Sequence, residues 1–374
     1  MDYSKATITL LDKFDIDLRN GFLPKAPPLN NLPHQYKVWD HLNNQMTEAI
    51  NEGSFIQKVN DLPAVRLGIL NKRELERAMM LLGAFAHAYI KESHAKVIPK
   101  QLAIPWEAVA NTLKRKPVIT HSSLVIENWG LIDPMKSFHL DNVETQFSFT
   151  GTKTESWFFL VTTNIEKVGA PAIPLLLESV YLGRSEAYEE ATLLLEKAVP
   201  IFKDVLAALR KMYEYCDPTI FYNQVRGYFD SFEDVRYEGT SPEIRSYPGG
   251  SAAQSSLLQF FDMALGIDYG ETRSKAFLID MRNYMPYPHR TFLDYVEQEY
   301  NLKTARENSD RLNQVCKKII EYLIEFRNEH LKIVSHYIVR PARKSQSSII
   351  GTGGTNPLIF LKDIRNKNKE HHEH

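Results

Sequence analysis

The feature that most constrains the fold is a long apolar stripe in the last third of the chain. Between residues 303 and 339, apolar side chains recur with the 3.6-residue period of an α-helix, and we expect this helix to stop before Pro341. The same period dominates elsewhere, without a regular alternation of strands and turns. Further helices are expected at residues 35–50, 72–92, 106–113, 155–181, 185–215, 218–229, 251–265, 272–284 and 289–300. The chain is therefore predicted to be all-α, with one candidate strand at residues 143–149.

An irregular stretch at residues 116–151 divides the expected helices into two groups. Within them, Pro105 is expected at a helix start and Pro200 at a kink, because proline lacks the amide hydrogen that a helix interior needs. The division predicts a smaller N-terminal helical domain, residues 1–150, packed on a larger C-terminal helical bundle, residues 151–374.

Composition excludes several classes of protein. The chain has 45 basic and 46 acidic side chains, so it offers no excess of positive charge to a nucleic acid. Its two cysteines, Cys216 and Cys316, provide no disulfide framework, and no apolar run has the length of a signal peptide or a membrane span. Aromatic residues make up 11%, which suits either a wide apolar cavity or simply a larger core. We expect a cytoplasmic protein without nucleic-acid or membrane partners.

His330 lies in the centre of the apolar stripe of the long C-terminal helix. At about 100° per residue, Phe326 and Val334 fall within about 40° on either side of it. A histidine in this position is most often a core residue bonded to a carbonyl oxygen. The alternative is an axial ligand that projects from a rigid helix onto a haem iron and leaves the opposite face open. Periodicity does not choose between these interpretations.

Segments in this chain resemble those of the indoleamine 2,3-dioxygenase family, in the same order and spacing. They are residues 249–256 (GGSAAQSS), 281–290 (MRNYMPYPHR), 326–334 (FRNEHLKIV) and 351–355 (GTGGT). Weaker similarity extends from about residue 155 onward. The resemblance implies an all-α, two-domain haem protein whose larger domain holds haem b, with His330 as the proximal iron ligand.

The implied reaction is the insertion of O2 into the indole 2,3-bond of L-tryptophan, which gives N-formylkynurenine in the kynurenine pathway. The implied partners are L-tryptophan or a related indole, O2, and an electron donor that keeps the haem ferrous. Two alternatives remain open: a related haem enzyme that acts on a tryptophan derivative, and a helical haem-binding or sensing protein without turnover. Product analysis with L-tryptophan would separate them.

The resemblance also assigns candidate residues on the distal side. Phe158 and Phe221 would contact the indole, Thr162 would place its hydroxyl over the iron, and Arg226 would bind the substrate carboxylate with its forked guanidinium. Taken alone, the run at residues 157–162 predicts helix core, and Arg226 predicts a surface or ion-paired arginine.

The remaining candidates lie near the cofactor or over the substrate. Gly250, Ser251 and Ala252 would let the backbone approach the haem, with Ser251 donating to a propionate or to the substrate; the alternative for Ser251 is an ordinary N-cap. Arg327 would reach a propionate and Asp262 would pair with it, although Asp262 alone predicts a solvated helix charge. The loop 341–355 would form a mobile lid that brings Thr352 over the substrate amine.

Three histidine-containing features fall outside this pattern. His121 stands where better-known animal members carry tyrosine, and we expect a solvent-exposed loop histidine there, or else a change in pocket polarity. His139 and Asp141 match half of an iron-binding motif that usually belongs to a β-sandwich, so we expect coincidence. The tail at residues 371–374 could bind a metal weakly, or be an artificial extension or solvated terminus, and it is left out of the fold prediction.

Overall fold

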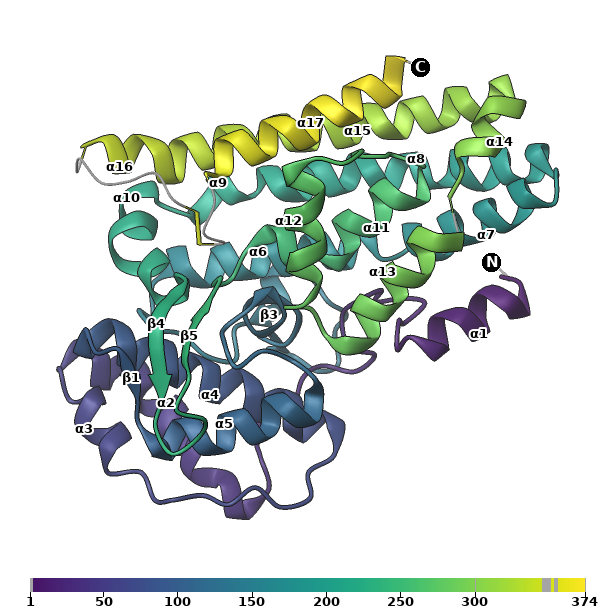
Figure 1. The fold of residues 1–374 in the computed structure, drawn as a ribbon. Coiled ribbons are helices and arrows are strands. Elements are labelled where there is room, and N and C mark those ends of the chain that lie inside the picture. The colour runs from purple at the N-terminus through teal and green to yellow at the C-terminus, as the bar shows by residue number, and fades with distance from the viewer. Residues whose placement is uncertain (1–2, 300, 345–350, 353–355, 374) are drawn as a thin grey trace.

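A computed structural model of the chain describes residues 3–299, 301–344, 351–352 and 356–373. Helices dominate, as predicted, and they form two packed regions (Figure 1). The first region contains α2 (Lys37–Asn51), α3 (Phe55–Asn60), α4 (Lys72–Ser93) and α5 (Lys100–Leu113). The second contains α6 (Lys153–Gly169), α7 (Ala172–Arg184), α8 (Tyr188–Arg210), α9 (Met212–Tyr215), α10 (Pro218–Ile220), α11 (Ser256–Ala264), α12 (Arg273–Arg282), α13 (Tyr287–Glu299), α14 (Lys303–Asn308), α15 (Asp310–Val334), α16 (Arg340–Lys344) and α17 (Pro357–Glu373).

The N-terminal helix α1 (Lys5–Lys13) packs with the second region rather than the first. Leu11 and Phe14 are buried in the same apolar cluster as residues of α7, α11 and α13, and α1 lies beside these helices in Figure 1. A larger cluster joins α2, α4 and α5 to α6, α8 and α15. We retain a division near residue 150 as a proposal, with α1 belonging to the larger part.

The long C-terminal helix buries the predicted stripe but differs from the prediction at both ends. Ser309 caps α15 by accepting a hydrogen bond from the Leu312 backbone, which separates α14 from α15. The expected stop before Pro341 is wrong. A π-helical turn, η7 (Ser335–Val339), continues directly into α16. This wider turn lies just before Pro341, where a regular α-helix would bring the proline ring against a carbonyl.

Two other boundaries differ from the sequence prediction. Helix α5 begins at Lys100, because Pro99 rather than Pro105 precedes its first turn, and Pro105 lies inside it. The candidate strand at residues 143–149 is only β3 (Val143–Glu144), paired with β2 (Gly130–Leu131). Its continuation is irregular because the Gln146 and Phe147 amides both donate to the side chain of Asn128.

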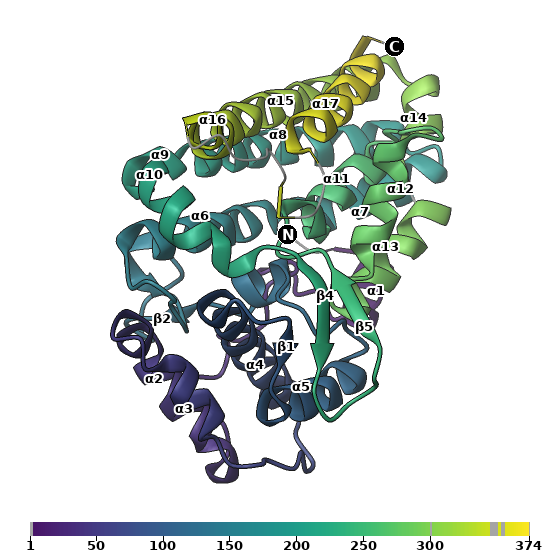
Figure 2. The same cartoon turned by 60° about the vertical axis from the view of Figure 1, so that its left-hand side comes forward.

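A hairpin and three helices, α1, α3 and α17, were not predicted. The hairpin is β4 (Phe232–Tyr237) with β5 (Ile244–Tyr247), and β4 also pairs in parallel with β1 (Val97–Ile98) (Figure 2). Helix α17 runs beside α15 in both views and includes most of the tail that had been set aside. Buried Leu361 and Ile364 attach α17 to the bundle. Residues 371–373 of the tail continue this packed helix, so they are part of the fold.

The helix expected at residues 185–215 is present as α8 followed by the short α9, and Pro200 lies inside α8. Among the residues that the structure describes, no helix combines the length and apolar character needed to cross a membrane.

Candidate functional site

A cavity of about 240 Å³ lies between α6, α11, α15 and α17. Every candidate residue named from the sequence lines it, although these residues are spread over nearly two hundred positions. They are Phe158, Thr162, Phe221, Arg226, Gly250, Ser251, Ala252, Asp262, Arg327, His330 and Thr352. Most of the other lining side chains are apolar, so a bound group would be largely shielded from water.

His330 reaches this cavity from the inner face of α15. Its ring is partly accessible through the cavity, while protein surrounds it on the other sides. Burial, and to a smaller extent the charge of Arg327, lowers the pKa of His330 to about 4. The imidazole is therefore neutral near neutral pH, which is the form that binds a metal.

Next to His330 lies a buried charge cluster, which we call the proximal cluster: Arg327, Asp262, Tyr269 and Asn368. Arg327 forms an ion pair with Asp262, and the Tyr269 hydroxyl donates to the same carboxylate oxygen. Asn368 Nδ2 donates to the other oxygen, Oδ1, at 3.2 Å. The expected pairing of Arg327 with Asp262 is present, and Asp262 is buried rather than solvated. Each charge is thus compensated inside the protein.

The opposite wall is built on α6. Phe158, Thr162 and Glu166 are four residues apart, so they lie on one face of the helix and follow the cavity along its length. Thr162 Oγ1 donates to the Phe158 carbonyl at 2.8 Å, which leaves the hydroxyl oxygen as an acceptor.

An aromatic group surrounds Phe158. The Phe158 ring lies 4.6 Å from that of Phe221 and 5.8 Å from that of Phe229, measured between centroids. Such rings offer a rigid apolar surface to a flat ligand. Phe229 was not predicted, since the sequence shows only its place at a helix end.

Arg226 lies in the turn η5 (Arg226–Phe229) beside this aromatic group. Its guanidinium is 3.6 Å from the Asp230 carboxylate, and the side chain is 14% exposed. Burial raises the pKa of Asp230, an effect that the charges of Arg226 and Lys91 oppose. The arginine is thus held at the cavity wall by a neighbouring acid rather than extended into solvent.

The glycine-rich segment closes the cavity beside Phe229. A side chain at Gly249 would come within 2.2 Å of the Phe229 carbonyl oxygen, so glycine is required there by the protein backbone itself. Ser251 caps the short turn η6 (Ala252–Gln254), as the alternative interpretation proposed. Its oxygen accepts from the Ala253 amide at 3.3 Å, and its hydroxyl hydrogen can still donate.

Thr352 forms two hydrogen bonds with Gly249 and Gly250 of this segment. Its carbonyl accepts from the Gly249 amide at 2.9 Å, and its hydroxyl donates to the Gly250 carbonyl. Of the predicted lid, residues 345–350 and 353–355 lie outside the described residues, and residues 341–344 belong to α16.

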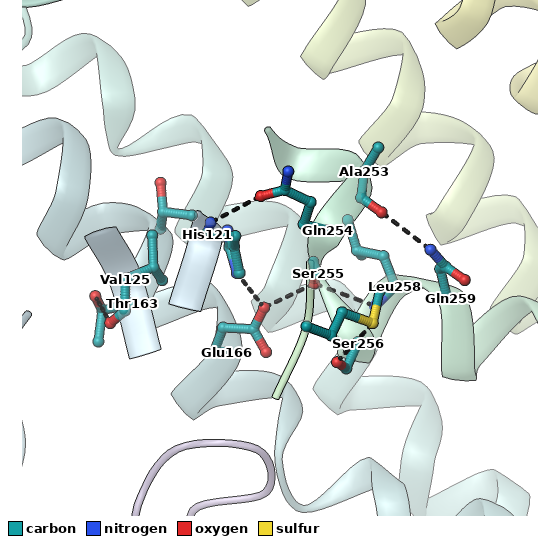
Figure 3. A network of polar contacts seen from close by, with 12 residues as sticks. His121, Val125, Thr163, Glu166, Ala253, Gln254, Ser255, Ser256, Leu258 and Gln259 are labelled. Carbon is teal, nitrogen blue, oxygen red and sulfur yellow. Dashed lines mark hydrogen bonds and ion pairs between the residues drawn. The ribbon is translucent and has the colours of Figure 1, made fainter. Parts of the chain in front are cut away.

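His121 differs from the expectation of a solvent-exposed loop histidine, which is wrong. Its side chain is 6% exposed and lines the cavity. Figure 3 shows it pointing toward Glu166 of α6, with Nε2 3.0 Å from Oε1. The Ser255 hydroxyl donates to the same oxygen at 2.7 Å. His121 is not in a loop but directly precedes the π-helical turn η2 (Ser122–Ile126), and its amide donates to Gln254 Oε1 at 2.9 Å, a tertiary contact that helps hold it in the interior.

Sequence reasoning missed several residues of these clusters. Glu166 carried a usable signal, because it follows Thr162 by one helical turn. Tyr269 carried no signal beyond its residue type, and Ser255 carried only its place in the family-like segment at residues 249–256. Asn368 belonged to a segment next to the excluded tail, and nothing local indicated that it would meet Asp262.

The geometry of the site defines a class of protein. A helical bundle encloses a largely apolar cavity that presents the His330 imidazole on the α15 wall, and aromatic rings and the His121–Glu166 pair on the other side. The one imidazole on the α15 wall suits a metal that brings its remaining ligands in a planar macrocycle, and the buried Arg327 beside it suits the acidic groups of a haem. The residues present therefore fit a helical haem protein.

Comparison with known proteins agrees with this class. The family model described as indoleamine 2,3-dioxygenase matches residues 10–371. Indoleamine 2,3-dioxygenase 2 of Mus musculus is 32% identical over 386 residues, which cover 96% of this chain and 95% of the relative. A 6-hydroxytryptophan 2,3-dioxygenase of Fusarium equiseti is 31% identical over 394 residues, covering 96% and 97%. The chain belongs to the indoleamine 2,3-dioxygenase family, a family of haem-dependent dioxygenases.

Proposed function

We propose that this protein cleaves the indole 2,3-bond of L-tryptophan, or of a tryptophan substituted on its ring, with O2 to give an N-formylkynurenine. The observation that supports this most directly is that every residue matched to the family's site lines one cavity. The names of the relatives support both substrates, since one is called an indoleamine dioxygenase and another a 6-hydroxytryptophan dioxygenase.

In this proposal the α15 wall holds the cofactor. His330 Nε2 or Nδ1 would bind the iron of haem b as its proximal ligand, and Arg327, fixed by Asp262, would face a propionate. Gly250 and Ala252 would contact the haem edge, and Ser251 would donate to a propionate or to the substrate. When bound, the haem supplies the activation of O2, and an electron donor keeps it ferrous.

The α6 wall orients the substrate. Phe158 and Phe221 would contact the indole, Arg226 would bind the carboxylate, and Thr352 would contact the amine from its position over Gly250. The Thr162 oxygen, whose hydrogen is committed to the helix backbone, would act as an acceptor toward the reacting region. These apolar and aromatic surfaces exclude water and fix the ring geometry, which lowers the entropy cost of the reaction.

The test combines haem binding with product analysis. We expect purified protein to bind one b-type haem and to convert L-tryptophan to N-formylkynurenine under reducing conditions. His330→Ala should lose the Soret absorption or turnover, whereas His336→Ala, which removes an imidazole on the same helical segment, should retain both.

Two outcomes would contradict the proposal. A His330→Ala protein with a normal haem spectrum and full turnover would exclude His330 as the ligand. Stoichiometric haem without product from any tryptophan would favour a haem-binding or sensing protein instead.

A further inference from the structure

The cavity contains a second polar cluster that the proposed reaction does not use. We call it the distal cluster: His121, Glu166 and Ser255 (Figure 3). Both the histidine and the serine direct their hydrogen bonds to Oε1 of Glu166. His121 and Glu166 are 6% and 2% exposed as side chains, and both line the cavity. A buried acid and imidazole that the reaction does not use need a reason, because desolvating them is costly.

The distal cluster offers acceptors to the cavity. Glu166 Oε2 is buried and has no hydrogen-bond partner among the residues that the structure describes. Leaving a buried carboxylate oxygen without a donor is costly, and a donor in the cavity would recover that cost. The His121 ring, through Nε2, holds the Glu166 carboxylate in place at Oε1. Oε2 has almost no accessible surface as placed, so a donor in the cavity reaches it when the carboxylate turns about its last torsion, which is soft in glutamate.

The position of the cluster relative to Arg226 indicates which part of a substrate reaches it. Glu166 lies two helical turns beyond Phe158, about 12 Å along the α6 axis. Arg226 lies at the Phe158 end, since its turn carries Phe229, whose ring stacks on that of Phe158.

The chain segment at residues 250–255, which also lines the cavity, runs in the same direction as α6. It begins at Gly250, which bonds to the Phe229 carbonyl at 3.2 Å, and it reaches Ser255 at Glu166. A tryptophan anchored by its carboxylate at Arg226 keeps its amino group there too, because both are on one carbon. The six-membered ring is the part farthest from that carbon, so it extends toward the distal cluster.

We infer that the distal cluster is a specificity subsite for a hydrogen-bond donor, a hydroxyl group, on the six-membered ring of a tryptophan. This inference rests on the proposed function and deepens it by naming the substrate class. The hydroxyl donates to the Glu166–His121 pair and satisfies the carboxylate oxygen that the protein leaves without a donor. A methyl group of similar size fills the same space but cannot donate.

The experiment compares pairs of ligands on the haem-loaded protein. Tryptophans with a hydroxyl at the 5, 6 or 7 position are each matched with the methyl analogue at that position. Equilibrium Kd is measured by calorimetry, and kcat/KM is measured in parallel. At one position or more, the hydroxyl analogue should bind about tenfold more tightly than its methyl partner, which corresponds to one hydrogen bond to a charged group.

Variants then assign the preference to the cluster. Glu166→Gln keeps the size of the side chain. Its amide oxygen can accept from Ser255 and His121, which directs the amide NH2 to the place of Oε2 and replaces an acceptor with a donor. We expect the hydroxyl preference to fall to near one in Glu166→Gln and to decrease in His121→Phe. Glu190→Gln, an exposed change on α8, is the matched control and should keep the preference.

The outcomes separate this inference from the proposed function. Absence of a hydroxyl preference in the unmodified protein overturns the subsite, and so does a preference that survives in Glu166→Gln. An equal loss for hydroxyl, methyl and unsubstituted ligands in Glu166→Gln also overturns it, because it indicates a general role or a contact with the ring N–H. If no tryptophan is turned over but the preference in Kd is present, the proposed function fails while the subsite stands.

Discussion

The two polar clusters in the cavity are built in opposite ways. In the proximal cluster, both carboxylate oxygens of Asp262 receive hydrogen bonds, and a permanent cation, Arg327, neutralises the charge. In the distal cluster, one oxygen of Glu166 receives two hydrogen bonds and the other receives none from the described residues. A saturated network serves the stability of the fold, whereas an unsaturated one is suited to bind a ligand. Substitutions in the two clusters should therefore affect different measurements.

The largest expected effect on this comparison comes from Asp262→Ala. Removing the acid leaves a buried guanidinium without its partner, and we expect a loss of about 3–5 kcal/mol in the free energy of unfolding. Chemical denaturation monitored by circular dichroism measures it. Glu325→Ala is the control, because that ion pair with Arg210 is more than half exposed and should contribute little.

A second variant keeps the test decisive if Asp262→Ala does not fold. Asp262→Leu combined with Arg327→Met removes both charges and should recover most of the lost stability. If the double variant is as unstable as Asp262→Ala, the cluster does not act through charge compensation.

A substitution on the substrate-binding side of the cavity should instead affect catalysis. Arg226→Ala removes a charge-assisted contact with the substrate. It should lower kcat/KM for L-tryptophan, raising the corresponding activation free energy by about 2–4 kcal/mol, with little change in the free energy of unfolding. An analogue lacking the carboxylate should show no such loss. Equal losses on both ligands would count against carboxylate binding by Arg226.

A buried histidine away from both clusters separates burial from charge pairing. Burial, together with the charges of Lys72 and Arg115, lowers the pKa of His289 to about 3. In the unfolded chain His289 binds a proton below about pH 6.5, whereas in the folded protein it stays neutral until the pH approaches 3. The stability that depends on this neutral imidazole is therefore fully present above pH 6.5 and is lost as the pH falls toward 3. Between pH 7.5 and 5, this histidine should destabilise the fold by about 2 kcal/mol.

His289→Leu should remove that part of the pH dependence, measured by denaturation at both pH values. His139→Leu, at an exposed position, should leave it unchanged. An unaltered pH dependence in His289→Leu would mean that the imidazole is solvated or paired in solution.

The smallest effect is expected from the C-terminal helix. Asn368→Leu removes one hydrogen bond to Asp262 and also a buried amide oxygen without a partner among the described residues, so we expect a loss of only about 1 kcal/mol. Asn366→Leu, an exposed neighbour on α17, is the control. A loss as large as that of Asp262→Ala would show that Asn368, rather than Arg327, holds the carboxylate in place.

The sequence by itself determined the helical class, the apolar face of α15 and the place of His330 at its centre. These follow from local periodicity, which depends only on residues a few positions apart. The family resemblance added the other candidate residues, and all of them line one cavity. The family comparison confirmed the membership.

Only the tertiary structure decided the burial of His121, the partners of Asp262 and the role of the tail. His121 meets Glu166 across 45 positions of the chain, and Asn368 meets Asp262 across 106. Hydrogen bonds between such distant segments leave no periodic trace in the sequence. The continuation of the helix through Pro341 was also undetermined, because a π-helical turn depends on packing around it rather than on local preference.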